Sequence, residues 1–474
     1  MAMRPYDVEG MTGVEAGNSL NSELLPSPVT APSSKWGLSS SLNFCSWRLP
    51  CGNPQNNVIF FQSNWSPPAY GGHPEATLHM DLRQITAEEF VEWVRVEARA
   101  YGNRLNADPE VLRPNFDLDR SIAVFDQGHI VGGAHSHLQE ISIPGGTSAI
   151  AGVANIAVQP THRRRGIMTD MMRHQLKDVY QRGEPLAGLF ASESVIYGRF
   201  GYGIGSLREE WSIHKHHSGY ARRWEPQGAF EFLDPSEIGT RLPEVFRRST
   251  IGRPGVFQKA PHLWEREARA PEHRQGGHGG IFYVAYCEND VMEGYARYRT
   301  GGDTVTVQEL MAVSRDAGAA LWRFCFDTDL VSRAEAERRP LDDPLPWMLS
   351  DPRRLHRSSR DGLWLRLVDV AAALSNRRYA AAGSLVLEVR DEVCPWNTAR
   401  FELEGAPEGA HSRTTDAPAD IAISVAALAS AYLGAVSFST LALAGLADEK
   451  RAGSLHLANH MFAVHQQPWT PCGF

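Results

Sequence analysis

One short stretch constrains the fold of this chain more than any other. Residues 153–168 read Val-Ala-Asn-Ile-Ala-Val-Gln-Pro-Thr-His-Arg-Arg-Arg-Gly-Ile-Met. An apolar run typical of a buried strand is followed by a proline, three arginines, a glycine and the start of a helical pattern. The first amides of a helix lack partners within it, and the helix dipole gives them partial positive charge. The order therefore predicts a strand–turn–helix unit that binds a pyrophosphate.

The arginines and the glycine have the chemical properties that an anion site needs. Arg163 to Arg165 supply hydrogen-bond donors, and Gly166 allows a ligand to approach the backbone closely. Taken alone, three consecutive arginines favour a solvated basic turn. Their position between a strand and a helix favours the anion site.

Length and charge limit the class of protein. A chain of 474 residues exceeds what one core usually supports, so we expect two or three domains. The hydrophobic share of 42% and the charged share of 22% are typical of a globular protein. A net charge of -8 argues against nucleic acid as a partner and favours a cationic small-molecule substrate.

Cysteine spacing and apolar runs bear on location. The six cysteines show no pairing or metal-ligand spacing, so we expect a reducing compartment and no metal. Residues 1–13 lack the apolar core of a secretory signal, and we expect a cytoplasmic protein. Residues 421–447 are uncharged and long enough to cross a bilayer. Their alanine-rich composition, with a cap at Ser424 and glycines at 434 and 445, instead predicts a buried helix followed by core segments.

Composition and periodicity divide the chain into four parts. Residues 1–76 are rich in Ser, Pro, Asn and Gly and predict a flexible N-terminal extension. Residues 77–220 predict a mixed α/β unit with a capping box at 86–89, helices over 90–100 and 166–181, and strands over 78–82, 122–125, 130–138, 149–158 and 186–190. Residues 221–366 repeat the strand-to-helix order without the arginine–glycine loop, and residues 367–474 form a third domain. Such an order also arises by chance, so a duplicated domain is one of two interpretations of the repeat.

The arginine loop resembles a known superfamily motif. Residues 163–168 fit the pattern Arg/Gln-x-x-Gly-x-Gly/Ala of the GNAT acetyltransferases except at Met168. The segment Pro-Leu-Ala-Gly-Leu-Phe-Ala-Ser-Glu-Ser-Val-Ile-Tyr-Gly-Arg-Phe-Gly-Tyr-Gly at 185–203 is similar to the enhanced intracellular survival (Eis) family of that superfamily. The resemblance covers residues 80–474, is tightest over 153–203, and recurs at 369–397 and at the carboxyl end.

The resemblance implies a fold and an activity. The fold is an α+β (mixed α/β) chain of two tandem GNAT domains, the second degenerate, and a sterol-carrier-protein-like domain. The expected activity is acetyl-CoA-dependent N-acetyl transfer to several amines of aminoglycoside antibiotics, a resistance function, by a homohexamer. Matching motifs place acetyl-CoA contacts at Ile156, Ala157, Val158, Arg164, Arg165, Gly166, Ile167, Met168, Thr169, Ser192 and Glu193.

The family match also assigns the acid and the base. It makes Tyr197 the acid that protonates the departing sulfur, and a tyrosine of pKa about 10 can donate to a thiolate whose thiol has pKa about 8.5. It makes the terminal carboxylate of Phe474 the base, which needs a pKa raised by burial. From the residues alone, packing is the preferred interpretation of Tyr197 and fraying that of the tail, and the family match reverses the preference for Tyr197.

Two other functions remain open from the sequence. The same domains suit a protein-lysine N-acetyltransferase or a CoA- or lipid-binding scaffold without turnover. Release of free thiol in the presence of an amine separates the enzymes from the scaffold. Mass increments on the drug or on a lysine peptide separate the two enzymes.

Overall fold

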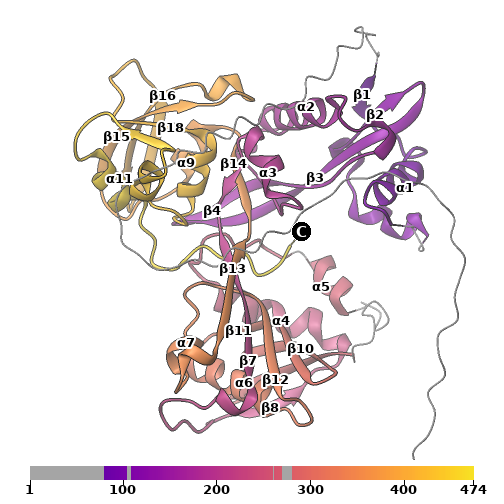
Figure 1. Cartoon of the computed structure of the whole chain (residues 1–474), viewed down its shortest axis with the longest axis vertical. Helices are drawn as coiled ribbons and strands as arrows, with labels where there is room; N and C mark the ends of the chain where they lie inside the picture. Colours follow the sequence, from indigo (N-terminus) through magenta and orange to yellow (C-terminus); the bar gives the residue numbers. More distant parts are fainter. Residues whose placement is uncertain (1–79, 104–107, 260, 269–279, 474) are drawn as a thin grey trace, which may run out of the picture. The chain divides into compact units, whose positions relative to one another are not determined.

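The computed structural model describes residues 80–103, 108–259, 261–268 and 280–473, all within one compact unit of residues 75–474. This part of the chain contains three β-sheets with helices packed against them (Figure 1). The α+β class is confirmed. The expected extension of residues 1–76 lies outside the described residues.

The first sheet carries the strands of the arginine-loop region. Its strands pair in the order β1 (Asp81–Gln84), β2 (Ser121–Asp126), β3 (His129–Ile143), β4 (Gly146–Val158), β5 (Leu186–Leu189), β14 (Trp364–Leu367) and β6 (Gly203–Ile204). The strands β1 to β4 form an antiparallel meander, and β5 joins β4 in parallel. The predicted strands at 122–125, 130–138, 149–158 and 186–190 are confirmed. The first strand is described from Asp81, and residues 78–79 of its predicted range lie outside the described residues.

Helices α1 (Phe90–Ala100) and α2 (Ile167–Gln181) lie on opposite faces of this sheet (Figure 1). Successive strand residues point to opposite faces. Ala123 and Phe125 of β2 pack with α1, while Ile122 and Val124 pack with Ile167 and Met171 of α2. Both helices occur where the apolar periodicity predicted them, and Glu89 Oε2 accepts a hydrogen bond from the Thr86 amide at 2.9 Å, one half of the predicted capping box.

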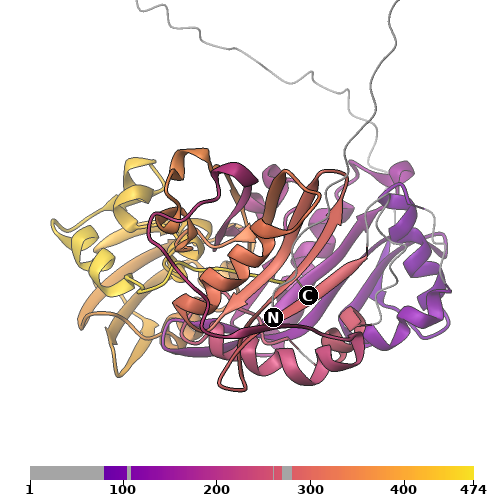
Figure 2. The ribbon, with the colours of Figure 1, turned by 90° about the horizontal axis from the view of Figure 1, so that it is seen from below.

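The second sheet follows a similar plan. Its strands pair in the order β13 (His356–Asp361), β7 (Leu207–His214), β12 (Arg333–Arg339), β11 (Thr304–Ala312), β10 (Val291–Gly301), β9 (Ile281–Glu288) and β8 (Ala229–Phe232). Figure 2 shows several of these strands side by side. Helix α6 (Arg315–Asp327) packs on one face, and α4 (Pro235–Ser249) and α5 (Pro261–Ala268) on the other. The short helix α7 (Leu345–Met348) precedes β13.

The two sheets exchange strands across the expected boundaries at residues 220 and 366. Strand β7 belongs by sequence to the first expected domain but pairs with β12 and β13 of the second sheet. Strand β14 belongs to the second expected domain but pairs with β5 and β6 of the first. Such pairings join segments about 150 residues apart, so local periodicity carries no signal for them.

The third sheet has the order β17 (Gly409–Thr414), β16 (Ala399–Ala406), β15 (Gly383–Arg390), β18 (Ile421–Ser424) and β19 (Ala447–Glu449). Its helices are α8 (Val370–Asn376), α9 (Val425–Tyr432), α10 (Phe438–Leu443) and α11 (Ser454–Phe462). Ser424 caps α9 by accepting a hydrogen bond from the Ala427 amide, as predicted. Among the described helices, none is long and apolar enough to cross a bilayer.

His135 is an ionisable side chain buried in the first sheet. Its ring is fully inaccessible to solvent, and its Nδ1 lies 2.8 Å from Ser121 Oγ. Burial, helped by the nearby His137 and Arg120, lowers the pKa of His135 to about 3. The imidazole is therefore neutral in the folded protein at neutral pH.

We expect His135 to make the folded protein sensitive to acid. In the unfolded chain His135 is protonated below about pH 6.5, whereas in the folded protein it stays neutral down to about pH 3. The contribution of the neutral imidazole to the free energy of unfolding is therefore fully present above pH 6.5 and is lost as the pH falls. The loss is about 1.4 kcal/mol per pH unit in this window. Urea midpoints from pH 7.5 to 4.5 check this against His135→Asn, which keeps a donor for Ser121. Parallel pH profiles for the two proteins would contradict the expectation.

Candidate active site

The strands β4 and β5 separate halfway along the first sheet. They pair only where Ile150 to Gly152 face Leu186 to Gly188. Just beyond, Asn155 and Ile156 both lie opposite Ala134 of β3, which makes a β-bulge with Asn155 at a φ of 56°. Bulges of this kind interrupt pairing and redirect side chains next to functional sites. The backbone of β4 beyond Gly152 therefore has a side that β5 leaves open to a ligand.

A cavity of about 720 Å³ lies at this opening. Its lining combines the end of α1, the bulged part of β4, the arginine loop, the first turn of α2 and the segment after β5. The lining residues are Ala100, Tyr101, Ile156, Ala157, Val158, His162, Arg163, Arg164, Gly166, Ile167, Met168, Thr169, Ser192, Glu193, Ile196, Tyr197 and Arg199. The structure thus brings together every predicted cofactor residue except Arg165, together with Tyr197.

The start of α2 forms an anion-binding geometry. Gly166 has a φ of 84°, which only glycine adopts without strain, and the first hydrogen bonds of the helix run from Thr169 and Asp170 to the Gly166 carbonyl. The amides of Gly166, Ile167 and Met168 precede these bonds and remain available to a ligand. The residues present therefore fit a pyrophosphate group.

The three arginines have different roles. Arg163 donates from Nη2 to the Ala100 carbonyl at 2.7 Å and so ties the end of α1 to the loop. Arg164, at a φ of 65°, is exposed and lines the cavity. Arg165 lies away from the cavity lining and donates a long hydrogen bond of 3.4 Å to the Thr161 carbonyl. Arg164 is thus the guanidinium best placed for a bound anion.

Tyr197 ends the short helix α3 (Ser194–Tyr197), which follows β5. Its side chain is buried at 6% exposure, with the ring 6.3 Å from that of Tyr202, yet it lines the cavity. Within the described residues the phenol oxygen makes no hydrogen bond, so its proton is free to go to a ligand. Tyr197 can therefore pack in the core with its ring and still offer its hydroxyl to a ligand in the cavity.

The carboxyl-terminal tail is docked as far as Gly473. Trp469 Nε1 donates to the Arg338 carbonyl at 2.6 Å, and Thr470 Oγ1 donates to the Gly255 carbonyl at 2.8 Å. Trp469 and Cys472 are buried against α4 and the second sheet. A Cβ on Gly473 would lie 3.6 Å from the ring of Phe190, the residue after β5. Phe474 itself lies outside the described residues.

Among the cavity residues that sequence reasoning missed, two polar side chains bear on the chemistry of the site. Tyr101 donates a hydrogen bond from its hydroxyl to the Ile156 carbonyl at 2.9 Å, and burial raises its pKa to about 12, with smaller effects from Tyr197 and Glu97. Arg199 lies 3.7 Å from Met168 Sδ and adds a third arginine to the cavity lining. Arg199 stands inside the family-like segment 185–203 and could have been found there, whereas no local pattern points to Tyr101.

Four acidic residues between α1 and β2 are surface groups. Asp108, Glu110, Asp117 and Asp119 are all exposed, and Asp119 pairs with Arg182 at 2.9 Å. None of the four lines the cavity. Nor does any described group of three or more His, Cys, Asp or Glu side chains have the arrangement of a metal site.

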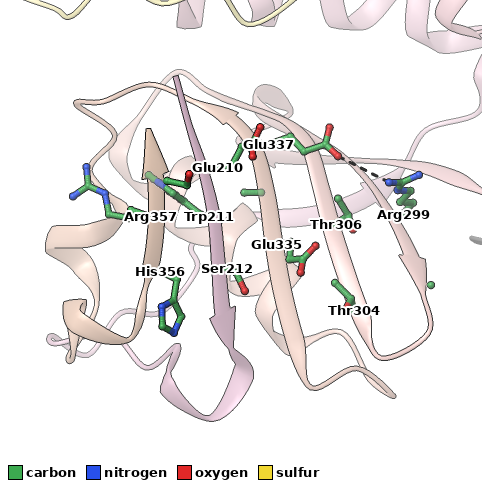
Figure 3. Close-up of a pocket in the computed structure, with 13 residues that line it drawn as sticks. Glu210, Trp211, Ser212, Arg299, Thr304, Thr306, Glu335, Glu337, His356 and Arg357 are labelled. Carbon is green, nitrogen blue, oxygen red and sulfur yellow. Dashed lines mark ion pairs between the residues drawn. The ribbon is translucent and has the colours of Figure 1, made fainter. Parts of the chain in front are cut away.

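A second cavity, of about 600 Å³, is lined by strands of the second sheet (Figure 3). Polar side chains from five strands line it, and Arg299 pairs with Glu337 across it at 3.9 Å. It contains none of the predicted site residues. The equivalent helix of this sheet, α6, is capped by its own Ser314, which accepts a hydrogen bond from the Ala317 amide. The first cavity is therefore the candidate active site.

Family models match most of the described chain. A GNAT acetyltransferase domain matches residues 81–205, a second one matches residues 255–367, and a sterol carrier protein domain matches residues 370–471. The expected duplication and the third domain are thereby confirmed. GNAT acetyltransferases take their acetyl group from acetyl-CoA.

Comparisons with individual proteins also indicate an N-acetyltransferase. An uncharacterized N-acetyltransferase of Streptomyces avermitilis is 38% identical over 83% of this chain and 99% of its own length. The N-acetyltransferase Eis of Mycobacterium tuberculosis is 34% identical over 66% of this chain and 78% of its own length. Among solved structures, Eis1 of Mycobacterium abscessus is 34% identical with a TM-score of 0.73, covering 83% of this chain and all of its own. The chain therefore belongs to the Eis family of GNAT N-acetyltransferases.

Proposed function

We propose that this protein acetylates several amino groups of aminoglycosides by direct transfer from acetyl-CoA, as a cytoplasmic homohexamer. One observation carries the proposal. A single cavity gathers all but one of the expected cofactor residues around Tyr197, at the place where β4 and β5 separate. The substrate class and the hexamer follow the family resemblance, and the four free cysteines among the described residues agree with a reducing compartment.

The chain's own groups would hold the cosubstrate in two places. The amides at the start of α2 and the Arg164 guanidinium would bind its pyrophosphate. The backbone of Ile156 to Val158 would hydrogen-bond the amide groups of its arm, because β5 leaves that side of β4 without a partner. When bound, acetyl-CoA supplies the thioester carbonyl.

Two residues would move protons in the transfer. The terminal carboxylate of Phe474 would take a proton from the acceptor ammonium, and the amine would form its N–C bond as the C–S bond breaks. Tyr197 would then donate its phenolic proton to the departing sulfur.

Thiol release tests the proposed function. The native protein should release free CoA when given acetyl-CoA and kanamycin A, and mass spectrometry should find one or more increments of one acetyl group on the drug. Acetyl groups on a lysine peptide alone would favour the protein acetyltransferase. Acetyl-CoA binding with no thiol release from any amine would favour the scaffold.

We expect Arg164 and Arg165 to differ in acetyl-CoA binding. Arg164→Ala removes a charge-assisted hydrogen bond, so the Kd should rise about ten- to hundredfold. Arg165→Ala is the matched control, because Arg165 stands in the same loop but away from the cavity lining, and its Kd should stay within about twofold of native. Titration calorimetry with CoA measures both. Equal losses in the two variants would contradict the geometry.

A further inference from the structure

Two hydrogen bonds fasten helix α1 to the bulge of β4. Asn155 Nδ2 donates to Glu97 Oε1 at 2.5 Å, and the Tyr101 hydroxyl donates to the Ile156 carbonyl at 2.9 Å. Glu97 and Tyr101 are one helical turn apart on the same side of α1. Their partners are consecutive residues of β4, and Asn155 takes the left-handed conformation that lets its side chain reach the helix.

This junction lies on the side of the sheet that the cosubstrate leaves open. The anion site is at the start of α2, whereas Glu97 and Tyr101 belong to α1, and the two helices cover opposite faces. Tyr101 still lines the cavity, so the cavity reaches through the opening between β4 and β5 to the α1 face. Glu97 lies one helical turn before Tyr101 on the same side of α1, next to the part of the helix that lines the cavity.

The Glu97 carboxylate has one oxygen that can accept a hydrogen bond from a cation. Asn155 engages Oε1, and in the described part of the chain Oε2 has no partner. Two arginines at the end of α1 are engaged elsewhere, since Arg99 pairs with Glu92 at 2.8 Å and Arg163 donates to the Ala100 carbonyl. Burial raises the pKa of Glu97, partly offset by the Asn155 hydrogen bond, so an incoming ammonium group would relieve the cost of holding a partly desolvated carboxylate.

We infer that Glu97 is a specificity-determining residue that binds a non-reacting ammonium group of the acceptor, so that a neighbouring amine reaches the acetyl group. The inference rests on the proposed function and names a residue for its acceptor side. It favours acceptors with two or more amines over monoamines. The role is one of binding and orienting the acceptor, because the ammonium group that Glu97 holds does not itself react.

Glu97→Gln tests the inference with little disturbance, because the amide oxygen still accepts the Asn155 hydrogen bond while the charge is lost. For kanamycin A, the KM and the calorimetric Kd should rise at least about tenfold, with kcat within about twofold of native and the Kd for CoA unchanged. Glu92→Gln is the matched control on the same helix and should behave as native. Thermal unfolding confirms that each variant folds, and Glu97→Ala provides a second measurement of the same loss.

The outcomes separate this inference from the proposed function. If the native protein releases no thiol with kanamycin A, the proposed function fails, and the Kd values of native and Glu97→Gln still decide the role of Glu97. If turnover is normal and the Kd and KM of Glu97→Gln equal those of native, the inference alone is overturned. Absence of kanamycin A binding to the native protein also overturns it. An equal loss in Glu92→Gln would reduce the effect to general electrostatics and overturn it as well.

Discussion

Adding a few residues after Phe474 is expected to lower kcat by about 100-fold or more while leaving the Kd for acetyl-CoA unchanged. The extension removes the α-carboxylate from its place and puts a peptide carbonyl there, which cannot act as the base. The cosubstrate site should persist, because it is built from β4 and the start of α2. Thiol release with kanamycin A and calorimetry with CoA measure the two quantities.

Because the tail is docked up to Gly473, an extension after Phe474 changes only the end of the chain. Trp469 and Thr470 are held by hydrogen bonds to Arg338 and Gly255, and Ser206 Oγ lies 3.1 Å from Thr470 Oγ1. The path to Gly473 is therefore fixed by contacts that an extension does not touch. The same residues placed before Met1 serve as the control, which should retain native turnover. Undiminished thiol release by the extended protein would reject the terminal carboxylate as the base.

Local signals in the sequence predicted the elements around the cosubstrate site. The apolar periodicity located α1 and α2, and the arginine–glycine order predicted the anion geometry at Gly166, because a glycine at a helix start and an apolar strand before it are properties of neighbouring residues. The role of Arg165 was not predictable in this way. Whether a guanidinium faces a cavity depends on the backbone of the turn, and here the left-handed residue Arg164 takes that place.

Contacts between segments far apart in the chain could not be predicted from the sequence. The exchange of β7 and β14 between sheets, the hydrogen bond from Tyr101 to the Ile156 carbonyl, and the docking of Trp469 on Pro254 and Gly255 join residues far apart in the chain. The tail composition alone left docking and fraying open. The second GNAT domain resolves this for the described tail, since its sheet and α4 supply the apolar surface that buries Trp469. The tail therefore packs against the second GNAT domain, in which Ser314 caps the start of α6.

Tyr197→Phe is expected to lower kcat by about 100-fold with little change in the KM for acetyl-CoA. The phenylalanine ring keeps the packing of α3 against the core, because only the hydroxyl is removed from a side chain that is 6% exposed. The departing thiolate then has to take its proton from water, which the buried setting disfavours. Steady-state thiol release with saturating kanamycin A gives kcat, and variation of acetyl-CoA gives the KM.

Tyr202→Phe is the matched control, because it removes a hydroxyl from a neighbouring ring. Tyr202 is 1% exposed, its hydroxyl has no hydrogen-bond partner in the described structure, and burial raises its pKa. Deleting an unsatisfied buried hydroxyl costs little, so kcat should stay within about twofold of native and the stability should hold or increase. Equal losses in the two variants would mean that the ring cluster, not the Tyr197 proton, limits turnover. A loss confined to Tyr197→Phe assigns the proton to the residue that lines the cavity.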